Sequence, residues 1–307
     1  MAQPDLLQSK KVLKTIQWPH PQFLNNAFLD PYVGCEYGCA YCYGIKEPNQ
    51  DNGDPVSPFR VGVKTNCAFS LKKELEGLST GNPNPKKGNI SIGIGFATDP
   101  YQNCEAQFHL TLRALEILKA AQYPIQIITK SELILRDAGI LAELSQEGMA
   151  AVSVSIFTMD ESVSRLFEPR VIAPKKRLDL IEKLKGKGVT CGAVLMPIIP
   201  YITDTEEDLD RTFAALKGAG ALYCVPGILS LGHAVVRDRM MKILSAAFPR
   251  VCYQYSVLFD ASGKPSASYC GKIEKILKSS AEKYEIPSVL PVLGYSEKQD
   301  LIVQDTI

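Results

Sequence analysis

The stretch DPYVGCEYGCAYCYG, residues 30–44, places three cysteines within eight residues. Cys35, Cys39 and Cys42 have the spacing C-x3-C-x2-C, and no fourth cysteine stands close to them. Gly34 and Gly38 belong to the same stretch, and glycine permits the backbone conformations that a tightly wrapped loop requires. Three thiols in one glycine-containing loop predict a metal or cluster site.

Composition limits the class of protein. The chain has 307 residues, of which 46% are hydrophobic, enough for one large domain or two ordinary ones. Its formal charge of +1 predicts no strong attraction to nucleic acid or to an acidic membrane, although a neutral total leaves room for a local basic patch. No apolar run follows Lys10, Lys11 and Lys14, and the longest apolar stretch, around 191–202, is short and interrupted by proline. We expect a cytoplasmic protein with reduced thiols.

Short β-branched runs alternate with segments of helical period. Strands are predicted at 26–33, 90–95, 125–129, 150–156, 189–196 and 221–225. Helices are predicted at 105–121, 137–146, 205–217 and 233–247, and helical stretches follow the strand at 150–156 and continue through residue 187. Six such βα units predict a parallel sheet with helices outside it, either doubly wound or a (β/α) barrel. No G-x-G-x-x-G turn follows the first strand, which disfavours a dinucleotide-binding fold.

Three regions are expected along the chain. Residues 1–25 are predicted to be an irregular N-terminal lead-in, 26–250 the barrel, and 251–307 a C-terminal extension packed on it with one helix near 272–284. Residues 76–89, rich in Gly, Asn and Pro, are predicted to form a surface connector.

The cysteine loop favours an iron–sulfur cluster over zinc. A structural zinc site usually closes with four ligands, commonly two close pairs, whereas this loop offers three thiols and Cys67 stands alone. A [4Fe–4S] cube normally takes four thiolates, so three would leave one iron open to another ligand. The six cysteines outside the loop are expected to be small buried hydrophobes. His20, His109 and His233 are far apart in the sequence and are expected to be structural.

C-x3-C-x2-C with an aromatic residue, Tyr41, before the last cysteine resembles the defining motif of the radical S-adenosylmethionine (SAM) enzymes. Further stretches extend the resemblance to the branch that contains the spore photoproduct lyases, over roughly residues 26–205. They are GFATDPYQNCE, ITKSELILRD, SVSIFTMDESVSRLFEPR, RLDLIEKL and MPIIPYITD. It implies a partial (β/α)6 barrel of the TIM type, in which Cys35, Cys39 and Cys42 ligate a [4Fe–4S] cluster. It also implies SAM on the open iron, cleaved to a 5′-deoxyadenosyl radical that abstracts hydrogen from a substrate.

Barrel enzymes carry their functional groups at the carboxyl ends of the strands. By the resemblance, Tyr41 would lie near the cluster and adenine, and Thr98 and Asp99 would hydrogen-bond the methionyl or ribose end of SAM. Lys130 would pair with the methionyl carboxylate, a suitable partner for a buried ammonium. A turn at Asp99-Pro100 and a solvated Lys130 are the alternatives.

Other candidates lie farther along the chain. Ser153 and Ser155 share one face of a strand, where either could reach the ribose or simply pack inward. Pro197 and Pro226 are expected just after the fifth and sixth strands, and Glu168-Pro169-Arg170 is expected to form a local ion pair or part of the substrate rim.

The chain departs from the lyases at one position. Spore photoproduct lyases place a hydrogen-donating cysteine just before the Ser/Thr-Asp step, where this chain has Ala97. Cys104, in the same loop, could substitute as hydrogen donor. The reaction class therefore stays open among lyase, transferase and oxidoreductase.

Partners and rival functions follow from the same residues. The expected electron donor is a flavodoxin or ferredoxin, the substrate can be a nucleic acid, a modified nucleotide, a peptide or a small metabolite, and no membrane partner is expected. The alternative functions are DNA photoproduct repair and, in another class, a zinc-stabilised nucleic-acid-binding protein without catalysis.

Overall fold

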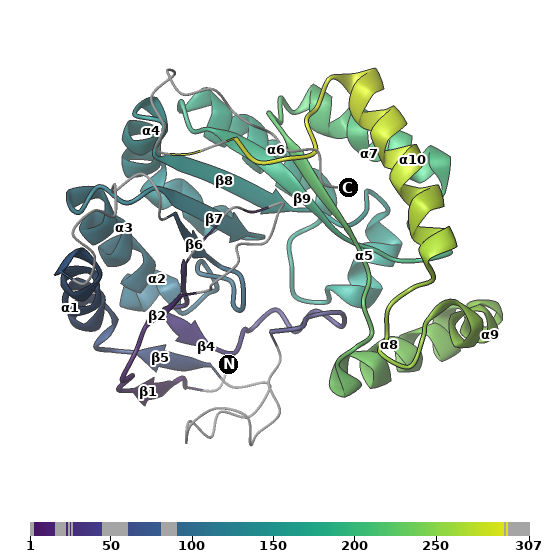
Figure 1. Ribbon diagram of the computed structural model, residues 1–307, viewed down its shortest axis with the longest axis horizontal. Coiled ribbons are helices and arrows are strands. Elements are labelled where there is room, and N and C mark those ends of the chain that lie inside the picture. Colours follow the sequence, from purple (N-terminus) through teal and green to yellow (C-terminus); the bar gives the residue numbers. More distant parts are fainter. Residues whose placement is uncertain are drawn as a thin grey trace.

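The computed structural model describes residues 3–15, 23, 25, 27–44, 61–80, 91–291 and 293, with only the backbone of 78–80. Its main sheet has seven strands in the order β10-β9-β8-β7-β6-β3-β2. Six of them are parallel and follow one another in chain order: β3 (Ala27–Leu29), β6 (Ile92–Ile94), β7 (Ile125–Thr129), β8 (Ala150–Ser155), β9 (Cys191–Ile198) and β10 (Cys224–Ile228). Strand β2 (Leu13–Thr15) adds antiparallel to the β3 edge. The α/β fold predicted from the alternation, consistent with a partial barrel, is confirmed (Figure 1).

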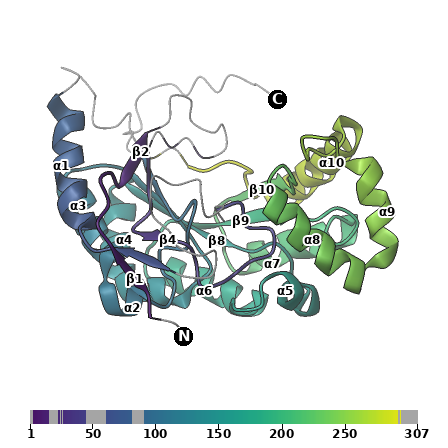
Figure 2. The same cartoon turned by 90° about the horizontal axis from the view of Figure 1, so that it is seen from below.

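Helices connect the parallel strands and cover the outer face of the curved sheet (Figure 2). The connecting helices are α1 (Cys67–Thr80), α2 (Glu105–Phe108), α3 (Leu110–Ala120), the 3₁₀ helix η2 (Glu132–Asp137), α4 (Ala138–Gln146), α5 (Glu161–Phe167), α6 (Pro174–Gly186) and α7 (Glu206–Gly218). Three more helices follow the last strand: α8 (Ala234–Ala247), α9 (Pro249–Leu258) and α10 (Ala267–Tyr284). The strands are buried on both faces, as parallel strands usually are, and leucines at helical spacing complete the core. Thr205 caps the N-terminus of α7, because its Oγ1 accepts a hydrogen bond from Asp208 N at 3.1 Å.

The predicted helix over 105–121 is wrong in one respect, because it breaks at His109. His109 has a left-handed backbone with φ 53°, and α2 and α3 lie on either side of it. The carboxylate of Glu105 folds back at the break and accepts hydrogen bonds from Thr111 N at 3.0 Å and from Arg136. The side chain thus supplies an acceptor that the first turn of α3 needs, a contact that helical periodicity does not reveal.

The N-terminal lead-in is not irregular throughout. Strand β1 (Asp5–Leu7) pairs with β5 (Gly62–Lys64), which pairs with β4 (Tyr32–Val33), and β2 joins the main sheet. These strands are too short for their alternation to stand out, and partners distant in sequence stabilise them. His20 lies outside the described residues.

Two further expectations differ from the structure. Residues 76–80 of the predicted connector belong to α1, while 81–89 lie outside the described residues. Residue 250, the last residue of the predicted barrel region, lies in α9, a helix that packs with α8 against one hydrophobic cluster, and the division of the chain into three regions stays a prediction. Pro197 and Pro226 lie within β9 and β10, because these strands continue past the point where proline interrupts the sequence pattern.

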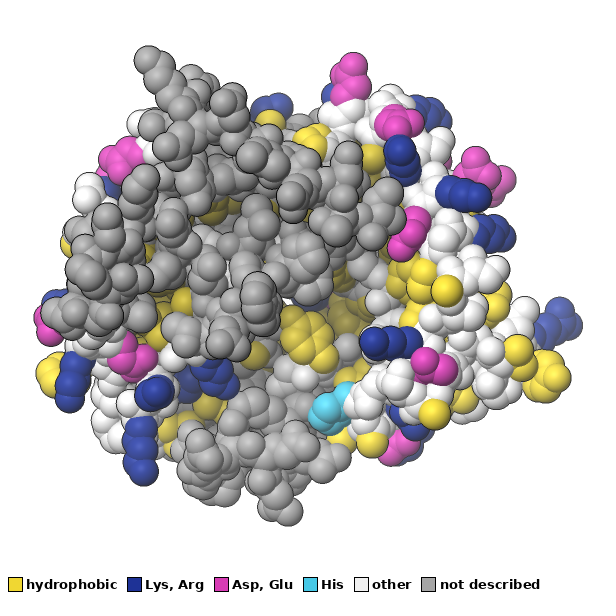
Figure 3. Space-filling view, in the orientation of Figure 1, with side chains coloured by type: hydrophobic (Ala, Val, Ile, Leu, Met, Phe, Trp, Pro, Cys, Tyr) yellow, Lys and Arg dark blue, Asp and Glu magenta, His cyan; other side chains and the backbone are white. Residues whose placement is uncertain are grey.

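Charged side chains of both signs are interspersed over the C-terminal helices (Figure 3). Ion pairs there join Lys217 to Glu285 and Lys283 to Asp210. In the described part of the chain, no helix is both long enough and apolar enough to cross a membrane.

Candidate functional site

The cysteine loop, residues 34–44, follows β4 and extends toward α8 (Figure 1). Gly34 and Gly38 have φ of 72° and 62°, values that other residues rarely adopt, so the glycines serve the wrapping predicted for them. Cys39 is buried, whereas Cys35 and Cys42 are partly exposed. Burial, and secondarily the nearby Asp99 carboxylate, raises the pKa of the Cys35 thiol to about 12.

The loop that follows β6 holds the cysteine loop in place. The buried amide of Gln102 donates from Nε2 to Gly34 O at 3.2 Å and accepts at Oε1 from Glu36 N at 3.0 Å, so it brackets Cys35 on both sides. At the far end, a Cβ on Gly44 would lie 2.0 Å from Ala97 O, a contact that only glycine allows. The two loops therefore pack backbone against backbone.

Asp99 is buried and its carboxylate is fully engaged within the protein. Oδ1 accepts from Thr129 Oγ1 at 2.7 Å and from Tyr101 N at 2.9 Å, and Oδ2 accepts from Lys130 N at 2.8 Å. Burial nevertheless raises the pKa of Asp99 above its ordinary value. In this arrangement Asp99 joins the ends of β6 and β7. The buried Thr98 lies beside it, with Oγ1 3.5 Å from Asp30 Oδ1.

A buried charge cluster lies beneath the cysteine loop. Glu168, after α5, pairs with Arg177 of α6 at 2.6 Å between Oε2 and Nη2, and both side chains are fully buried. The same carboxylate accepts the hydroxyl of Tyr41, which belongs to the cysteine loop. Lys130 Nζ lies 4.0 Å from Glu168 Oε1 and 5.9 Å from the centre of the Tyr41 ring. One carboxylate thus connects the cysteine loop, β7 and α6.

The Lys130 ammonium lies beside the cysteine loop in a long ion pair with Glu168. Burial lowers its pKa, but Cys39, Glu168 and Asp99 outweigh that effect and raise it above its ordinary value. Its side chain keeps 18% of its surface exposed, and its nearest described carboxylate oxygen is the one at 4.0 Å on Glu168. A charged amine held this loosely can turn to a ligand carboxylate with little rearrangement.

The remaining predicted residues occupy different settings. Ser153 is buried, with Oγ 2.9 Å from the Tyr223 hydroxyl, and Ser155 offers its backbone oxygen to Arg177 Nη1 at 2.8 Å. Cys104 is buried in the main hydrophobic core at the start of α2, and burial raises its thiol pKa. The settings of Ser153, Ser155 and Cys104 are compatible with a purely structural role. Their roles in binding and hydrogen transfer stay predictions.

The donor set of the loop fits an iron–sulfur cube. Within the described ranges, no three His, Cys, Asp or Glu side chains converge so as to hold a single metal ion. A cube does not need that convergence, because each thiolate bonds a different iron. Three soft thiol ligands on a wrapped loop match a cube in kind, and leave one iron for another ligand.

Gln102 and Arg177 belong to stretches that resemble the family, yet no role was predicted for them from the sequence. Gln102 is in GFATDPYQNCE, and Arg177 begins RLDLIEKL. The bond from Gln102 to Glu36 spans 66 residues. Of the two alternatives for Glu168-Pro169-Arg170, the local ion pair is wrong, because Arg170 donates to Glu36 O at 3.3 Å and Glu168 pairs with Arg177. The other alternative, a part of the substrate rim, stays a prediction. No single-sequence signal distinguishes the two arginines.

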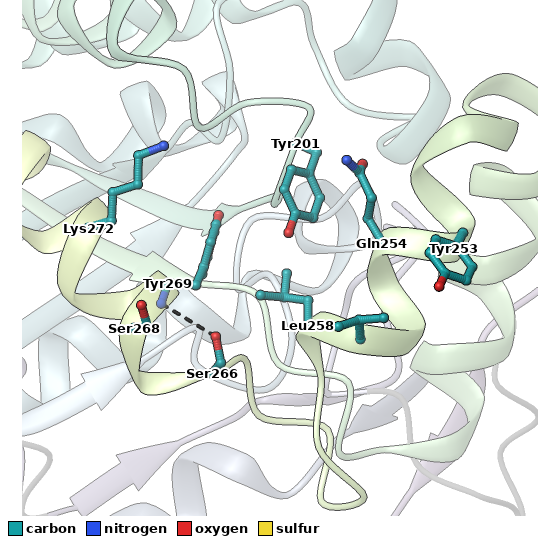
Figure 4. A pocket seen from close by; sticks show the side chains of 9 residues that line it. Tyr201, Tyr253, Gln254, Leu258, Ser266, Ser268, Tyr269 and Lys272 are labelled. Atoms are coloured by element: carbon teal, nitrogen blue, oxygen red, sulfur yellow. Dashed lines mark hydrogen bonds between the residues drawn. The ribbon is translucent and has the colours of Figure 1, made fainter.

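A separate groove of about 450 Å³ lies on the C-terminal extension (Figure 4). Tyr201, in the loop after β9, and Tyr269 of α10 line it with their ring centres 6.1 Å apart, and Gln254 of α9 points toward them. The Tyr269 hydroxyl donates to Asp204 at 2.6 Å and the Tyr255 hydroxyl to Pro200 O at 3.1 Å. These bonds fasten both helices to the loop after β9.

Comparison with known proteins agrees with this geometry. The family model of the Radical SAM superfamily matches residues 29–214, more than half of the chain. An uncharacterised protein of Mycobacterium tuberculosis (strain H37Rv) is 29% identical over 257 residues, which cover 83% of this chain and 73% of that protein. An uncharacterised protein of Methanocaldococcus jannaschii is 27% identical over 208 residues, covering 67% and 71%.

Among solved structures, a spore photoproduct lyase mutant with bound AdoMet and dinucleoside spore photoproduct superposes with a TM-score of 0.69 and 15% identity, covering 92% of this chain and 80% of that one. The lyase complexed with dinucleoside spore photoproduct gives 0.65 at the same identity and coverage. At this identity the likeness concerns the fold. Because the family model matches more than half of the chain, and because the cysteine loop and the parallel sheet agree with it, the chain belongs to the radical SAM superfamily.

Proposed function

We propose that the protein is a radical SAM enzyme that holds a [4Fe–4S] cluster through Cys35, Cys39 and Cys42 and acts on a substrate that its residues do not identify. Family membership implies an enzyme with this cluster and SAM. When bound, the cluster supplies the electron that cleaves SAM to the 5′-deoxyadenosyl radical. The protein orients the reactants and excludes water.

The observation that carries the proposal is the placement of Lys130 beside the cysteine loop. Its ammonium and the Tyr41 ring, 5.9 Å apart, come from the end of β7 and from the loop between Cys39 and Cys42. In the proposed complex Lys130 binds the carboxylate of SAM and Tyr41 borders the cluster. In the same complex Thr98, Asp99 and the β8 serines Ser153 and Ser155 would contact the methionyl or ribose end of SAM.

Anaerobic reconstitution tests the proposal. We expect a brown, oxygen-sensitive protein that contains about four irons and releases 5′-deoxyadenosine from SAM with dithionite. Alanine at each loop cysteine should abolish iron retention, whereas Cys270→Ala, a partly exposed thiol of α10, should retain it. The proposal is refuted if the protein keeps its iron when Cys35, Cys39 and Cys42 are all replaced by alanine. A colourless protein with about one zinc would also refute it and would favour the zinc-stabilised alternative.

Photoproduct repair is not proposed, because no observation favours it over other radical chemistry. The similar lyase structures contain a dinucleoside spore photoproduct. In this chain Ala97 takes the position expected for the donor cysteine, and Cys104 is buried in the core. Comparison of Cys104→Ala with the parent protein, by deuterium return from labelled 5′-deoxyadenosine, tests the predicted donor role of this thiol.

A further inference from the structure

The groove on the C-terminal extension gathers aromatic and apolar side chains at the surface. Tyr253 and Val257 of α9 are 78% and 72% exposed, and Tyr201 in the loop after β9 is 42% exposed. Nine large hydrophobic side chains are exposed in the described part of the chain, and three of them line this one groove. Single exposed hydrophobic residues are ordinary, whereas a group of them marks a binding site.

The fold holds the Tyr201 ring in the groove. Its backbone is left-handed, with φ 62°, a conformation that bulky residues rarely adopt. The Tyr255 hydroxyl donates to Pro200 O on one side of Tyr201, and the Tyr269 hydroxyl donates to Asp204 on the other. A ring that is already fixed loses little conformational freedom when a ligand packs on it. The loop therefore presents Tyr201 as a preformed contact.

Polar groups complement the rings. Gln254 points its amide toward Tyr201, and Lys272 and Tyr253 lie on opposite sides of that ring (Figure 4). The described residues that line the groove include the Lys272 ammonium and no carboxylate. Arg250 is exposed one turn before Gln254, on the same face of α9. In the part of the chain that the structure describes, neither of these two cations forms an ion pair.

The charge around the groove is only weakly positive. Residues 249–284, from α9 through α10, contain six lysines or arginines and three acidic residues, a net charge of +3. Asp204 and Asp210, which contact α10 from α7 and from the loop before it, reduce the net charge to +1. An anionic ligand would therefore be bound by the two local cations and not attracted by the extension as a whole.

The groove is too small for a stable protein interface. Nine described residues line it, whereas each side of such an interface usually has about 20–30. Its volume of about 450 Å³ lies within the range of about 300–1,000 Å³ that is usual for ligand sites. Flat rings, an amide and two cations favour a ligand that is planar and anionic.

We propose that the groove binds an unpaired strand of nucleic acid, with bases on the Tyr201 and Tyr253 rings and phosphates at Lys272 and Arg250. Aromatic side chains stack with any base, because every base has a π-face, and cations bind the backbone. The two cations come from different helices, so a strand with a phosphate on each side of a stacked base can reach both. A free mononucleotide offers only one phosphate. This inference goes beyond the proposed function and does not depend on the cluster.

Fluorescence anisotropy of a labelled oligothymidylate of about eight nucleotides tests the proposal on the whole chain. Tyr253→Ala should weaken binding about 10-fold, since one base–aromatic stack has an effect of that order. The variant should fold, because the Tyr253 side chain is mostly exposed and alanine favours helices. Phe69→Ala is the matched control, as it removes a 73% exposed ring from α1, and it should bind like the parent protein.

The salt dependence tests the phosphate contacts. Two neutralised phosphates predict a slope of about −1.4 for the logarithm of the binding constant against that of the salt concentration. Arg250→Ala with Lys272→Ala should weaken binding and bring the slope close to zero. Lys72→Ala with Lys73→Ala, on the exposed side of α1, should leave both unchanged.

Four results would overturn the proposal. They are no binding of the oligonucleotide by the parent protein, equal weakening by Tyr253→Ala and Phe69→Ala, a salt slope that the Arg250/Lys272 variant keeps, and equally tight binding of thymidine monophosphate or of a duplex. The assay contains neither SAM nor reductant, so its failure leaves 5′-deoxyadenosine formation with dithionite unaffected. Failure of that reaction would contradict only the proposed function.

Discussion

The substitution Glu168→Gln tests the buried charge cluster most directly. It removes one negative charge and keeps the shape of the side chain and an oxygen that can accept the Tyr41 hydroxyl. Arg177 then stays fully buried without its counter-ion, and its Nε already has no hydrogen-bond partner among the described residues. The change therefore isolates the charge from the packing.

The magnitude follows from the geometry. Opposite charges 2.6 Å apart attract by about 6 kcal/mol at an effective dielectric constant of about 20. Part of that is regained when water and neighbouring dipoles rearrange, and loss of one partner of a buried pair typically costs about 3–5 kcal/mol. At roughly 2 °C per kcal/mol for a chain of this size, the melting temperature should fall by about 6–10 °C.

Thermal unfolding of the apo protein, followed by circular dichroism, measures the effect. Glu161→Gln is the matched control, since it breaks the exposed pair of Glu161 with Arg165, and such a pair contributes less than about 1 kcal/mol. Replacement of both partners, Glu168→Gln with Arg177→Met, should recover part of the loss, because the guanidinium no longer stays buried without a counter-ion, whereas Lys130 still lacks the Glu168 carboxylate. A Glu168→Gln variant as stable as the Glu161→Gln variant, or a double variant less stable than the single one, would refute the reasoning.

Two further predictions concern the supports of the site. Gln102→Ala removes the partners of the partly buried Gly34 carbonyl and Glu36 N–H beside Cys35, so we expect a loss of about 1 kcal/mol in the unfolding free energy and faster iron release to a chelator. Asp160 caps α5, and its hydrogen bonds, that of Ser162 first, hold its pKa below the usual 3.8. Its contribution is therefore complete above that unfolded value and lost as pH falls through the lower folded pKa. Asp160→Ala should cost about 1 kcal/mol at pH 7, with the difference shrinking in acid, whereas Asp160→Asn keeps a cap that does not titrate.

Periodicity predicted the parallel sheet because its signal is local. Each of β7, β8 and β9 is an apolar run of strand length followed by a segment of helical period, and the hydrophobic effect buries both in one arrangement. The same reasoning missed β1 and β5, whose three-residue lengths leave no pattern. It also extended one helix across His109, because periodicity does not reveal the left-handed backbone of His109 or the Glu105 carboxylate that accepts from Thr111 N at the start of α3.

The candidate site divides in the same way. The spacing of Cys35, Cys39 and Cys42 predicts a cluster-binding loop, because ligands of one cluster must lie close together on one wrapped backbone. The supports of the loop come from elsewhere in the chain, Gln102 from the second βα unit and Glu168 with Arg177 from the fourth. One sequence offers no means to tell which of many polar residues will meet across such separations.

The sequence by itself determined the fold class and the cysteine loop, since both depend on the order and spacing of neighbouring residues. Only the tertiary structure decided that Glu168 pairs with Arg177 and not with Arg170. It also decided that the Asp99 carboxylate accepts hydrogen bonds from Thr129 and from two backbone N–H groups. It alone placed the turn between α5 and α6 against the cysteine loop. The physical reason is that burial leaves each charge with the partners the fold brings within hydrogen-bond distance, and those partners are far away in the chain.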